Sequence, residues 1–212
     1  MKYAIYIIIA LSLVFLGRRS AQYTYDKYSN KFISVSTYKA RQRNILFLGD
    51  SHVSLGNWTC LLDRCDVANQ GYSGATSKNM LSSLKIVPAL RPQKVLIMSG
   101  VNNILLDSPK ESYLADIATT VDALKDNDIE PILHNIICIR EGSWNAAAIN
   151  PVIRDWNKSL DSLCRSKGVP VINLNRIISD STGLIATYSR PDGVHLNEEG
   201  YRVWAIEILK TL

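Results

Sequence analysis

The sequence lacks the patterns that would place it among nucleotide-binding or nucleic-acid-binding proteins. It contains no Walker or dinucleotide-binding glycine motif and no stripe of lysine and arginine interleaved with aromatic residues. The formal charge of +5 is concentrated at the start, where Lys2, Arg18 and Arg19 precede every acidic residue. These are three of the 24 basic residues, so residues 20–212 carry 21 basic against 19 acidic groups. We therefore expect no nucleic-acid partner.

A long hydrophobic run is also missing. The run at residues 4–16 falls within the span of a signal-peptide core and short of the roughly 20 residues that a membrane helix needs. Residues 1–21 are accordingly interpreted as a cleaved signal peptide or as an N-terminal anchor that tethers the protein to a membrane through residues 4–16. Arg18 and Arg19 disfavour a clean cleavage site, and they also oppose the positive-inside rule for an anchored, exported domain. Both interpretations predict a periplasmic or extracellular protein.

Cysteine is scarce, with only Cys60, Cys65, Cys138 and Cys164. Their spacing does not suggest zinc, and we expect neither a metal nor a cofactor. In an exported protein, a bridge between Cys60 and Cys65 is the first to test, because a five-residue separation can close a loop. Cys138 and Cys164 are equally consistent with two buried thiols and with a second bridge.

Composition divides the remaining chain into a short segment and one domain. Residues 22–43 are polar, basic and rich in tyrosine, without helical or strand periodicity, and are interpreted as a linker or surface strap. Residues 44–212 suffice for one domain with a sizeable core, since 47% of the chain is hydrophobic. Strand patterns alternate with helical ones, which predicts a three-layer α/β/α fold around a mostly parallel five-stranded sheet.

The individual elements are predicted from periodicity and end signals. We expect strands in the apolar run that begins at residue 44 and at residues 66–68, 94–98, 130–137 and 169–174. Helices are expected at residues 54–63 and 111–126, from an Asn150 cap with Pro151 in the first turn to Gly168, and from Asn197 onward. His134, inside one strand, is interpreted as a core or sheet-edge histidine rather than a catalytic one.

The first strand ends in Gly49, Asp50 and Ser51. Ligands of open α/β sheets bind at the carboxyl ends of parallel strands, so Ser51 is placed where chemistry is usually done. Taken alone, the tripeptide is also a common strand-ending turn. The Gly-x-Ser-x-Gly elbow of the commoner α/β hydrolases is absent.

A base for this serine occurs near the other end of the chain. Asp192 lies three residues before His195, and a single turn lets the carboxylate meet Nδ1 of the ring while Nε2 faces Ser51. The alternative is a surface turn at Asp192 and Gly193 followed by a histidine packed before the last helix.

Two more loops match the need for oxyanion donors. Gly71 follows the second strand, and its backbone N–H has no side chain in the way. Asn102 follows the third strand and offers a side-chain amide. Each loop alone could be an ordinary strand-to-helix connection.

These four segments, in this order, resemble the SGNH (GDSL-type) hydrolase family over residues 44–212. The resemblance implies Ser51 as nucleophile, His195 as base and Asp192 as its orienter. It also implies an oxyanion hole from the Ser51 and Gly71 amides and the Asn102 side chain. The chain departs from the family at Asn103, where Asp is common, and at His52, where Leu is common. We expect His52 to shape the cleft.

The predicted function is hydrolysis of a carboxylic ester through an acyl-serine intermediate. The leading substrate is a short acyl group, such as acetyl, on a glycan or glycoconjugate, because Arg140, Glu141, Ser143 and Trp144 in the loop at residues 138–150 offer polar and stacking contacts. The alternative for Trp144 is packing on the following helix. A lysophospholipase, a thioesterase and an acyltransferase remain as other functions. A non-catalytic glycan-binding module is disfavoured by the presence of Ser51, Asp192 and His195.

Overall fold

The computed structural model describes residues 43–212. The predicted leader at residues 1–21 and the linker, apart from Arg43, lie outside the described residues. Five strands form one sheet in the order β2-β1-β3-β4-β5, and every neighbouring pair is parallel. The strands are β1 (Ile45–Gly49), β2 (Val67–Gly71), β3 (Lys94–Met98), β4 (Glu130–His134) and β5 (Val171–Ile172). The predicted three-layer fold is confirmed.

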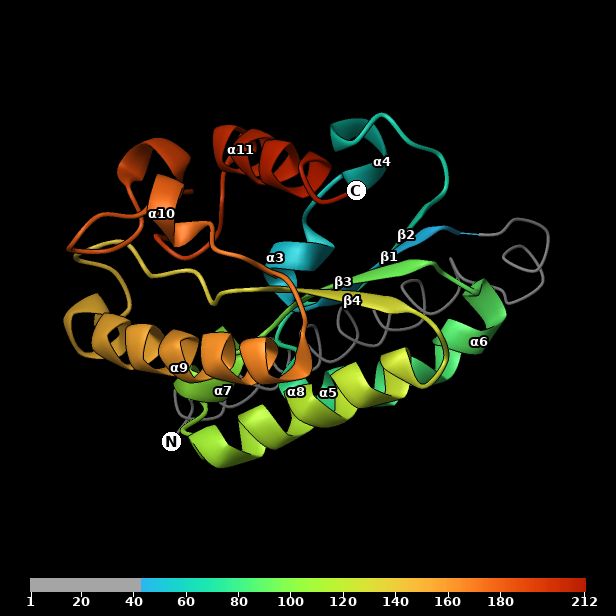
Figure 1. Ribbon diagram of the computed structural model, residues 1–212. Coiled ribbons are helices and arrows are strands. Elements are labelled where there is room, and N and C mark those ends of the chain that lie inside the picture. The colour runs from blue at the N-terminus through green and yellow to red at the C-terminus, as the bar shows by residue number, and fades with distance from the viewer. Residues whose placement is uncertain (1–42) are drawn as a thin grey trace, which may run out of the picture. The chain divides into compact units, whose positions relative to one another are not determined.

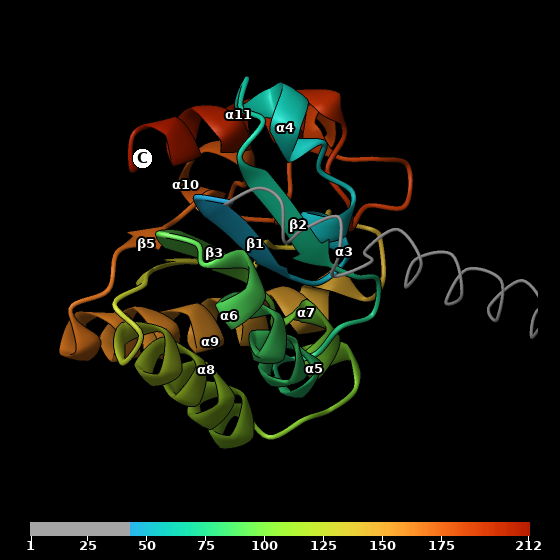
Figure 2. The same cartoon turned by 90° about the vertical axis from the view of Figure 1, so that its right-hand side faces the viewer.

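Helices cover both faces of this sheet (Figures 1 and 2). One layer contains α4 (Trp58–Leu61), α10 (Asn175–Ile178) and α11 (Glu198–Leu209). The opposite layer contains α5 (Ser77–Ser83), α6 (Val87–Leu90), α7 (Val101–Leu105), α8 (Lys110–Lys125) and α9 (Ala146–Lys167). The short α3 (Ser51–Ser54) and the 3₁₀ helices η1 (Leu84–Ile86) and η2 (Ala186–Tyr188) complete the described elements. Because both faces are covered, the central strands are mostly apolar, as is usual for parallel strands.

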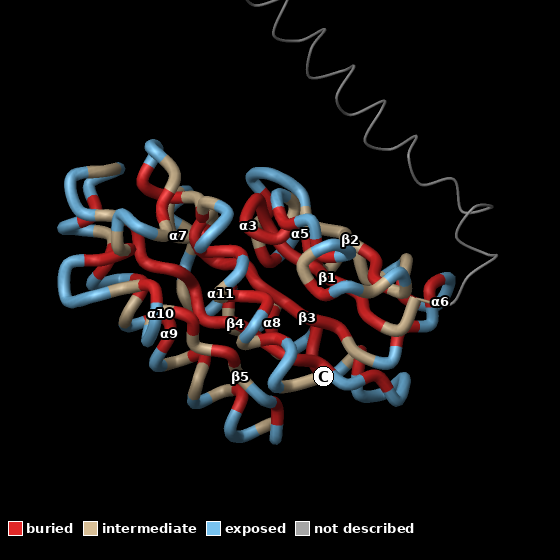
Figure 3. The backbone as a smooth tube through the Cα atoms, turned by 90° about the horizontal axis from the view of Figure 1, so that it is seen from above, coloured by how far each residue is buried: buried red, intermediate tan, exposed pale blue. Residues whose placement is uncertain are grey.

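The core on the α11 side is built from stacked aromatic rings. Phe47 of β1 stacks on Trp58 with ring centroids 4.2 Å apart, and Trp58 meets Trp204 of α11 edge to face at 4.7 Å. The Trp58 indole N–H donates to the Val53 carbonyl, so its polar atom is satisfied inside the core. Figure 3 shows the buried residues running along β1, β3 and β4. This packing holds the C-terminal helix against β1, the strand that leads into Ser51.

The strand order places the functional loops together. The chain goes from β1 to β2 on one side and then crosses to β3 on the other, so the order reverses beside β1. In open α/β sheets, ligands bind at such a reversal, outside the carboxyl ends of the strands. The loops after β1, β2 and β3 therefore meet at one edge.

The predicted helix at residues 54–63 was wrong, because this range holds only the last residue of α3, a non-helical stretch at residues 55–57 and the one-turn helix α4. Between them the Trp58 ring packs on Gly56, where a Cβ would lie only 2.4 Å from the indole. Asn69 donates from Nδ2 to the carbonyls of Val53, Ser54 and Gly56, which satisfies the backbone that a continuous helix would have used.

The start of the long helix was also predicted wrongly. α9 begins at Ala146, and Pro151 lies inside it rather than in its first turn. The three alanines at residues 146–148 are strong helix formers. Asn150, predicted as a cap, is buried and bonds both the N–H and the carbonyl of Ile139 and the carbonyl of Thr182. These tertiary bonds anchor the added turn despite the proline.

Two strands are shorter than predicted because side-chain amides replace strand pairing. β4 ends at His134, and the next residues run extended without a ladder. There, Asn157 bonds both backbone groups of Ile136, and Asn175 accepts from the Cys138 N–H. β5 accordingly pairs over Val171 and Ile172 alone. In contrast, β2 is longer than predicted, and β3 and α8 occupy nearly the predicted ranges. The helices between β2 and β3 were not predicted.

All four cysteines are free thiols, so the bridge between Cys60 and Cys65 that we expected to test first is not formed. Cys60 and Cys65 are exposed, while Cys138 and Cys164 are buried. Burial raises the pKa of the Cys164 thiol to about 12. Within residues 43–212, no helix has the length and apolar character needed to cross a membrane.

Candidate active site

Ser51 is the first residue of α3, directly after β1 and its cap. The carboxylate of Asp50 accepts the His52 N–H at 2.9 Å, the bond expected of an N-cap aspartate. Asp50 is buried, and the loss of solvent raises its pKa to about 7 although backbone hydrogen bonds act in the opposite direction. Ser51 is 8% exposed. The strand end and the helix start thus fix the serine at the carboxyl edge of the sheet.

Ser51, His195 and Asp192 lie in one hydrogen-bonded line. The Ser51 Oγ is 2.8 Å from the His195 Nε2, and the His195 Nδ1 is 2.8 Å from the Asp192 Oδ2. An ionised carboxylate only accepts, so the Nδ1 carries the hydrogen and the Nε2 is left to accept from the serine hydroxyl. The structure therefore brings together the three residues that the sequence predicted as nucleophile, base and orienter.

The Asp192 carboxylate is held in its ionised form. Partial burial opposes ionisation, but hydrogen bonds from the His195 ring and from the N–H groups of His195 and Val194 outweigh it and lower the pKa of Asp192 to about 2. An ionised Asp192 fixes the tautomer of the imidazole and favours its protonated form when that form appears.

The turn that carries this pair is fastened to a neighbouring loop. Arg140 donates its backbone N–H to the Gly193 carbonyl and its guanidinium to the Pro191 carbonyl, both at 2.8 Å. Gly193 has a φ of +75°, and a Cβ there would lie 2.1 Å from the Ser143 Oγ. Only glycine meets both conditions. On the other side, Asn197 caps α11 by accepting the Gly200 N–H, so the helix begins three residues after the histidine.

Asn102 lies in the first turn of α7, beside Ser51. One hydrogen of its side-chain amide goes to the Ala75 carbonyl at 3.0 Å, which ties the loop after β2 to the helix after β3. The amide has a second N–H, so it can also donate to a substrate oxygen. Asn102 is thus placed as predicted.

Gly71 does not have the environment predicted for it. Its backbone N–H donates to the Asn69 Oδ1 at 2.9 Å, and it does not line the cavity at Ser51. Gly74, three residues later in the same loop, does line that cavity. No acceptor among residues 43–212 engages the N–H of Gly74 or of Ser51. The loop contains two glycines, and sequence reasoning chose the one that ends the strand.

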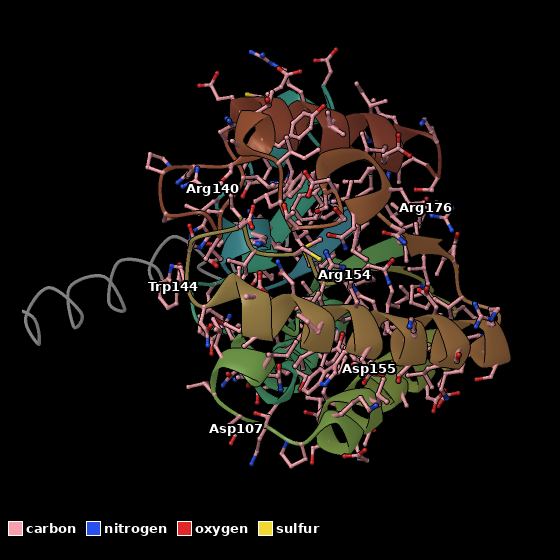
Figure 4. The ribbon with its side chains drawn as sticks, turned by 90° about the vertical axis from the view of Figure 1, so that its left-hand side faces the viewer. Asp107, Arg140, Trp144, Arg154, Asp155 and Arg176 are labelled. Atoms are coloured by element: carbon pink, nitrogen blue, oxygen red, sulfur yellow. The ribbon has the colours of Figure 1, made fainter. Side chains whose placement is uncertain are left out.

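The cavity at Ser51 is small and has a mixed lining. It measures about 190 Å³ and is lined by Ser51, Ser73, Gly74, Val101, Asn102, Leu105, Trp144, Asp192, Val194 and His195. Sequence reasoning did not assign a role to Ser73, Val101, Leu105 or Val194, because their residue types do not indicate that they line a cavity. Trp144 is 60% exposed, so the alternative of packing on the following helix is wrong. Figure 4 shows it with Arg140 in the loop before α9.

The other two histidines are buried. His134 packs edge to face against Trp204 at 5.3 Å, which confirms it as a core histidine, and burial lowers its pKa to about 4. His52 does not line the cavity. Its ring instead meets the His195 ring edge to face, with centroids 5.4 Å apart and an interplanar angle of 80°.

Asn103, where the resemblance led us to expect Asp, has a structural role. It is buried, its Oδ1 accepts the Ser77 N–H, and its Nδ2 donates to the Ser77 Oγ, both at 3.0 Å. The Ser77 hydroxyl then donates to Asp116. The amide therefore holds the first turn of α5 against α7 by accepting and donating at once, which an ionised carboxylate cannot do.

This combination of parallel sheet, serine, histidine and aspartate defines a serine hydrolase. Residues 47–203 match the GDSL-like Lipase/Acylhydrolase family, and the chain belongs to this family. It is an ester-hydrolysing enzyme.

Similar proteins agree with this assignment. An isoamyl acetate-hydrolyzing esterase from Saccharomyces cerevisiae is 22% identical over 168 residues, which cover 70% of this chain and 69% of the yeast protein. The structure of a GDSL-like lipase from Bacteroides thetaiotaomicron superimposes with a TM-score of 0.72 at 19% identity, covering 88% of this chain and 96% of that one. A catalytic mutant of an acetylxylan esterase from Geobacillus stearothermophilus gives a TM-score of 0.66 at 17% identity, covering 78% and 92%. At these identities the two structures establish the shared fold.

Proposed function

We propose that the enzyme removes acetyl and other short acyl groups from a glycan or glycoconjugate through an acyl-serine intermediate on Ser51. The hydrogen-bonded line from Ser51 through His195 to Asp192 carries this proposal. No metal or cofactor takes part in the proposed reaction.

In the first step the Ser51 Oγ attacks the ester carbonyl carbon while its proton passes to the His195 Nε2. Asp192 supports the imidazolium that forms. The tetrahedral intermediate then expels the alcohol, which takes the proton from Nε2, and the acyl group stays on Ser51. Water, deprotonated by the same nitrogen, repeats the sequence and releases the carboxylic acid.

The negative charge on the tetrahedral oxygen needs donors that are already in place. We assign this role to the backbone N–H groups of Ser51 and Gly74 and to the Asn102 amide, all in residues that line the cavity. Gly71 is not proposed as a donor, since its N–H is engaged by Asn69.

The preference for short acyl groups rests on the size of the cavity. About 190 Å³ must hold the reacting ester group and part of its alcohol, which leaves little room for a long tail. Two of the similar proteins described above are named for acetyl esters, which supports the same choice.

The glycan preference rests on the exposed Trp144, which lines the cavity and belongs to the same loop as Arg140 and the exposed Glu141. An indole face packs well on the apolar face of a sugar ring, and flanking charged groups can bond its hydroxyls.

A serine-reactive fluorophosphonate probe tests the nucleophile. We expect it to label wild-type protein and the matched control Ser54→Ala, but not Ser51→Ala. Ser51→Ala and His195→Ala should each reduce turnover to the residual level, and the double variant should be little worse because the residues act as a unit. If folded Ser51→Ala keeps more than about a tenth of the activity, another group is the nucleophile.

A series of nitrophenyl esters from acetyl to octanoyl tests the acyl preference. Each methylene that finds an apolar groove would gain about 0.8 kcal/mol. We expect acetyl or propionyl esters to have the highest kcat/KM. A steady rise to eight carbons would instead support a lipase or thioesterase.

A further inference from the structure

His52 is a buried histidine beside the reacting groups, and the proposed reaction gives it no task. His52 directly follows Ser51 in the sequence, and it is only 2% exposed. Burial, reinforced by the nearby His195, lowers the pKa of His52 to about 3, so its imidazole is neutral in the pH range of ester hydrolysis. Among residues 43–212, no protein group bonds its Nδ1.

The contact between His52 and His195 complements the two hydrogen bonds of the base. Those bonds attach Asp192 to Nδ1 and Ser51 to Nε2, at opposite sides of the imidazole. These two hydrogen bonds fix the position of the His195 ring. They only weakly resist rotation of the ring about the axis that joins Nδ1 and Nε2. A ring packed at 80° to the imidazole blocks that rotation.

His52 is itself held firmly. Its backbone N–H donates to the Asp50 Oδ1 at 2.9 Å, and its carbonyl accepts the Tyr201 hydroxyl at 2.7 Å. Tyr201 belongs to α11, which begins just after His195. The residue that contacts the base is therefore tied to the strand end that carries the nucleophile and to the helix that follows the base.

We propose that His52 is a positioning residue that holds the His195 ring in the plane required for proton transfer with Ser51. This inference rests on the proposed roles of Ser51 and His195. The contact requires the flat side chain of an aromatic ring, which a branched aliphatic residue of similar size does not supply.

The charge state of His52 fits this role. The groups that act on its imidazole are His195, Asp192 and Arg190. When His195 gains a proton in the transition state, a charged His52 would repel it across the 5.4 Å between the rings. A neutral ring does not, and its π face can attract a cation.

The test compares His52→Ala, His52→Leu and His52→Phe with a matched control, His134→Ala. His134 is buried to the same extent and also packs edge to face on an aromatic ring, but in the core. All variants are assayed on nitrophenyl acetate for kcat and KM and for their rate of reaction with the fluorophosphonate probe. Unfolding in urea and circular dichroism establish that each is folded. Ser51→Ala, measured alongside, tests the proposed function separately from this inference.

We expect His52→Ala to lower kcat and the phosphonylation rate about tenfold or more, because small misplacements of a catalytic group are costly. KM should stay within about twofold, since His52 does not line the cavity. His52→Phe should recover most of the rate and His52→Leu less. His134→Ala should lose stability but keep its kcat.

Three results would overturn the inference. They are a folded His52→Ala with nearly wild-type kcat, an equal loss of kcat in His134→Ala, and recovery by Leu as complete as by Phe. A raised KM at unchanged kcat would assign His52 to substrate binding instead.

Discussion

At the scale of the residue, one amide group serves two purposes in Asn102. One N–H of the amide donates to the Ala75 carbonyl, and the other can donate to the oxyanion that forms during the reaction. Asn102→Ala should lower kcat by roughly 10²- to 10³-fold, about 3 to 4 kcal/mol, because the lost donor acts mainly on charge that forms in the transition state. Steady-state kinetics on nitrophenyl acetate should show little change in KM.

Asn102→Asp is the matched variant, since it keeps the shape but replaces the donor with a negative charge. It should be at least as slow as Asn102→Ala. An unchanged kcat with a raised KM in the alanine variant would mean that Asn102 only holds the substrate.

The four segments taken together, in their order along the chain, identify the serine, the histidine and the aspartate, although each segment alone has an ordinary structural explanation. They do not identify which glycine faces the cavity. Gly71 ends β2 and Gly74 lies three residues later, and only the side chain of Asn69 decides that the N–H of Gly71 is engaged. That bond depends on the course of the backbone, which the sequence does not reveal.

At the scale of the element, the turn that carries Asp192 and His195 depends on Gly193. An alanine there would need a left-handed φ and would also collide with Ser143. We expect Gly193→Ala to lower kcat by an order of magnitude or more, because the turn must shift and the line to Ser51 would lengthen.

Gly142 is the matched control for this prediction. Its φ of +78° is nearly the same, but a Cβ there would meet nothing within 4 Å. Gly142→Ala therefore introduces only backbone strain, and the kcat of this variant should stay close to that of wild type. Equal kinetics for the two folded variants would show that the contact with Ser143 does not position the turn.

The loop between β4 and α9 should determine the alcohol part of the substrate. Trp144→Ala removes the exposed indole, so KM for an acetylated oligosaccharide should rise severalfold, while kcat for nitrophenyl acetate should change little. Leu106→Ala is the control, because Leu106 is 67% exposed and lies outside the cavity. If Trp144→Ala affects both substrates equally, the indole contacts the acyl group rather than a sugar.

The elements predicted from the sequence were those with one dominant signal. β3 is a continuous apolar run, α8 has a clear helical period, and Gly168 ends α9 as predicted. The wrongly predicted element boundaries lie where a side chain, rather than another backbone segment, hydrogen-bonds the backbone. Asn157 and Asn175 satisfy the segment after β4 without a strand, and Asn150 anchors a turn before Pro151. An asparagine in a sequence gives no sign of which backbone group it will meet.

At the scale of the whole molecule, alternating strands and helices were enough to predict the layers, since a parallel sheet must be covered on both faces. The meeting of the loops after β1, β2 and β3 at the carboxyl edge of the sheet was also predictable, because parallel strands all end at the same edge. What these patterns could not predict is that the fold also buries the titratable groups Asp50 and His52, in addition to His134, whose burial was expected. These groups make the stability of the protein depend on pH.

His134 should make the folded state sensitive to acid. Burial lowers its pKa from 6.5 to about 4, so the unfolded chain takes up a proton at a higher pH than the folded one does. Its contribution to stability is complete above pH 6.5 and is lost as the pH falls through 4, and the difference corresponds to about 3 kcal/mol. Asp50 acts in the opposite sense. Its raised pKa of about 7 gives a contribution that is complete below pH 4 and is lost as the pH rises through 7.

The prediction is tested by urea unfolding of wild type and His134→Phe between pH 7 and pH 4. Phenylalanine can keep the edge contact with Trp204 but cannot titrate. Because Asp50 and His52 are present in both proteins, their effects cancel in the comparison. The free energy of unfolding of wild type should fall relative to that of His134→Phe by up to about 3 kcal/mol over this range. If the two pH profiles are parallel, His134 is protonated at the same pH in the folded and unfolded chains.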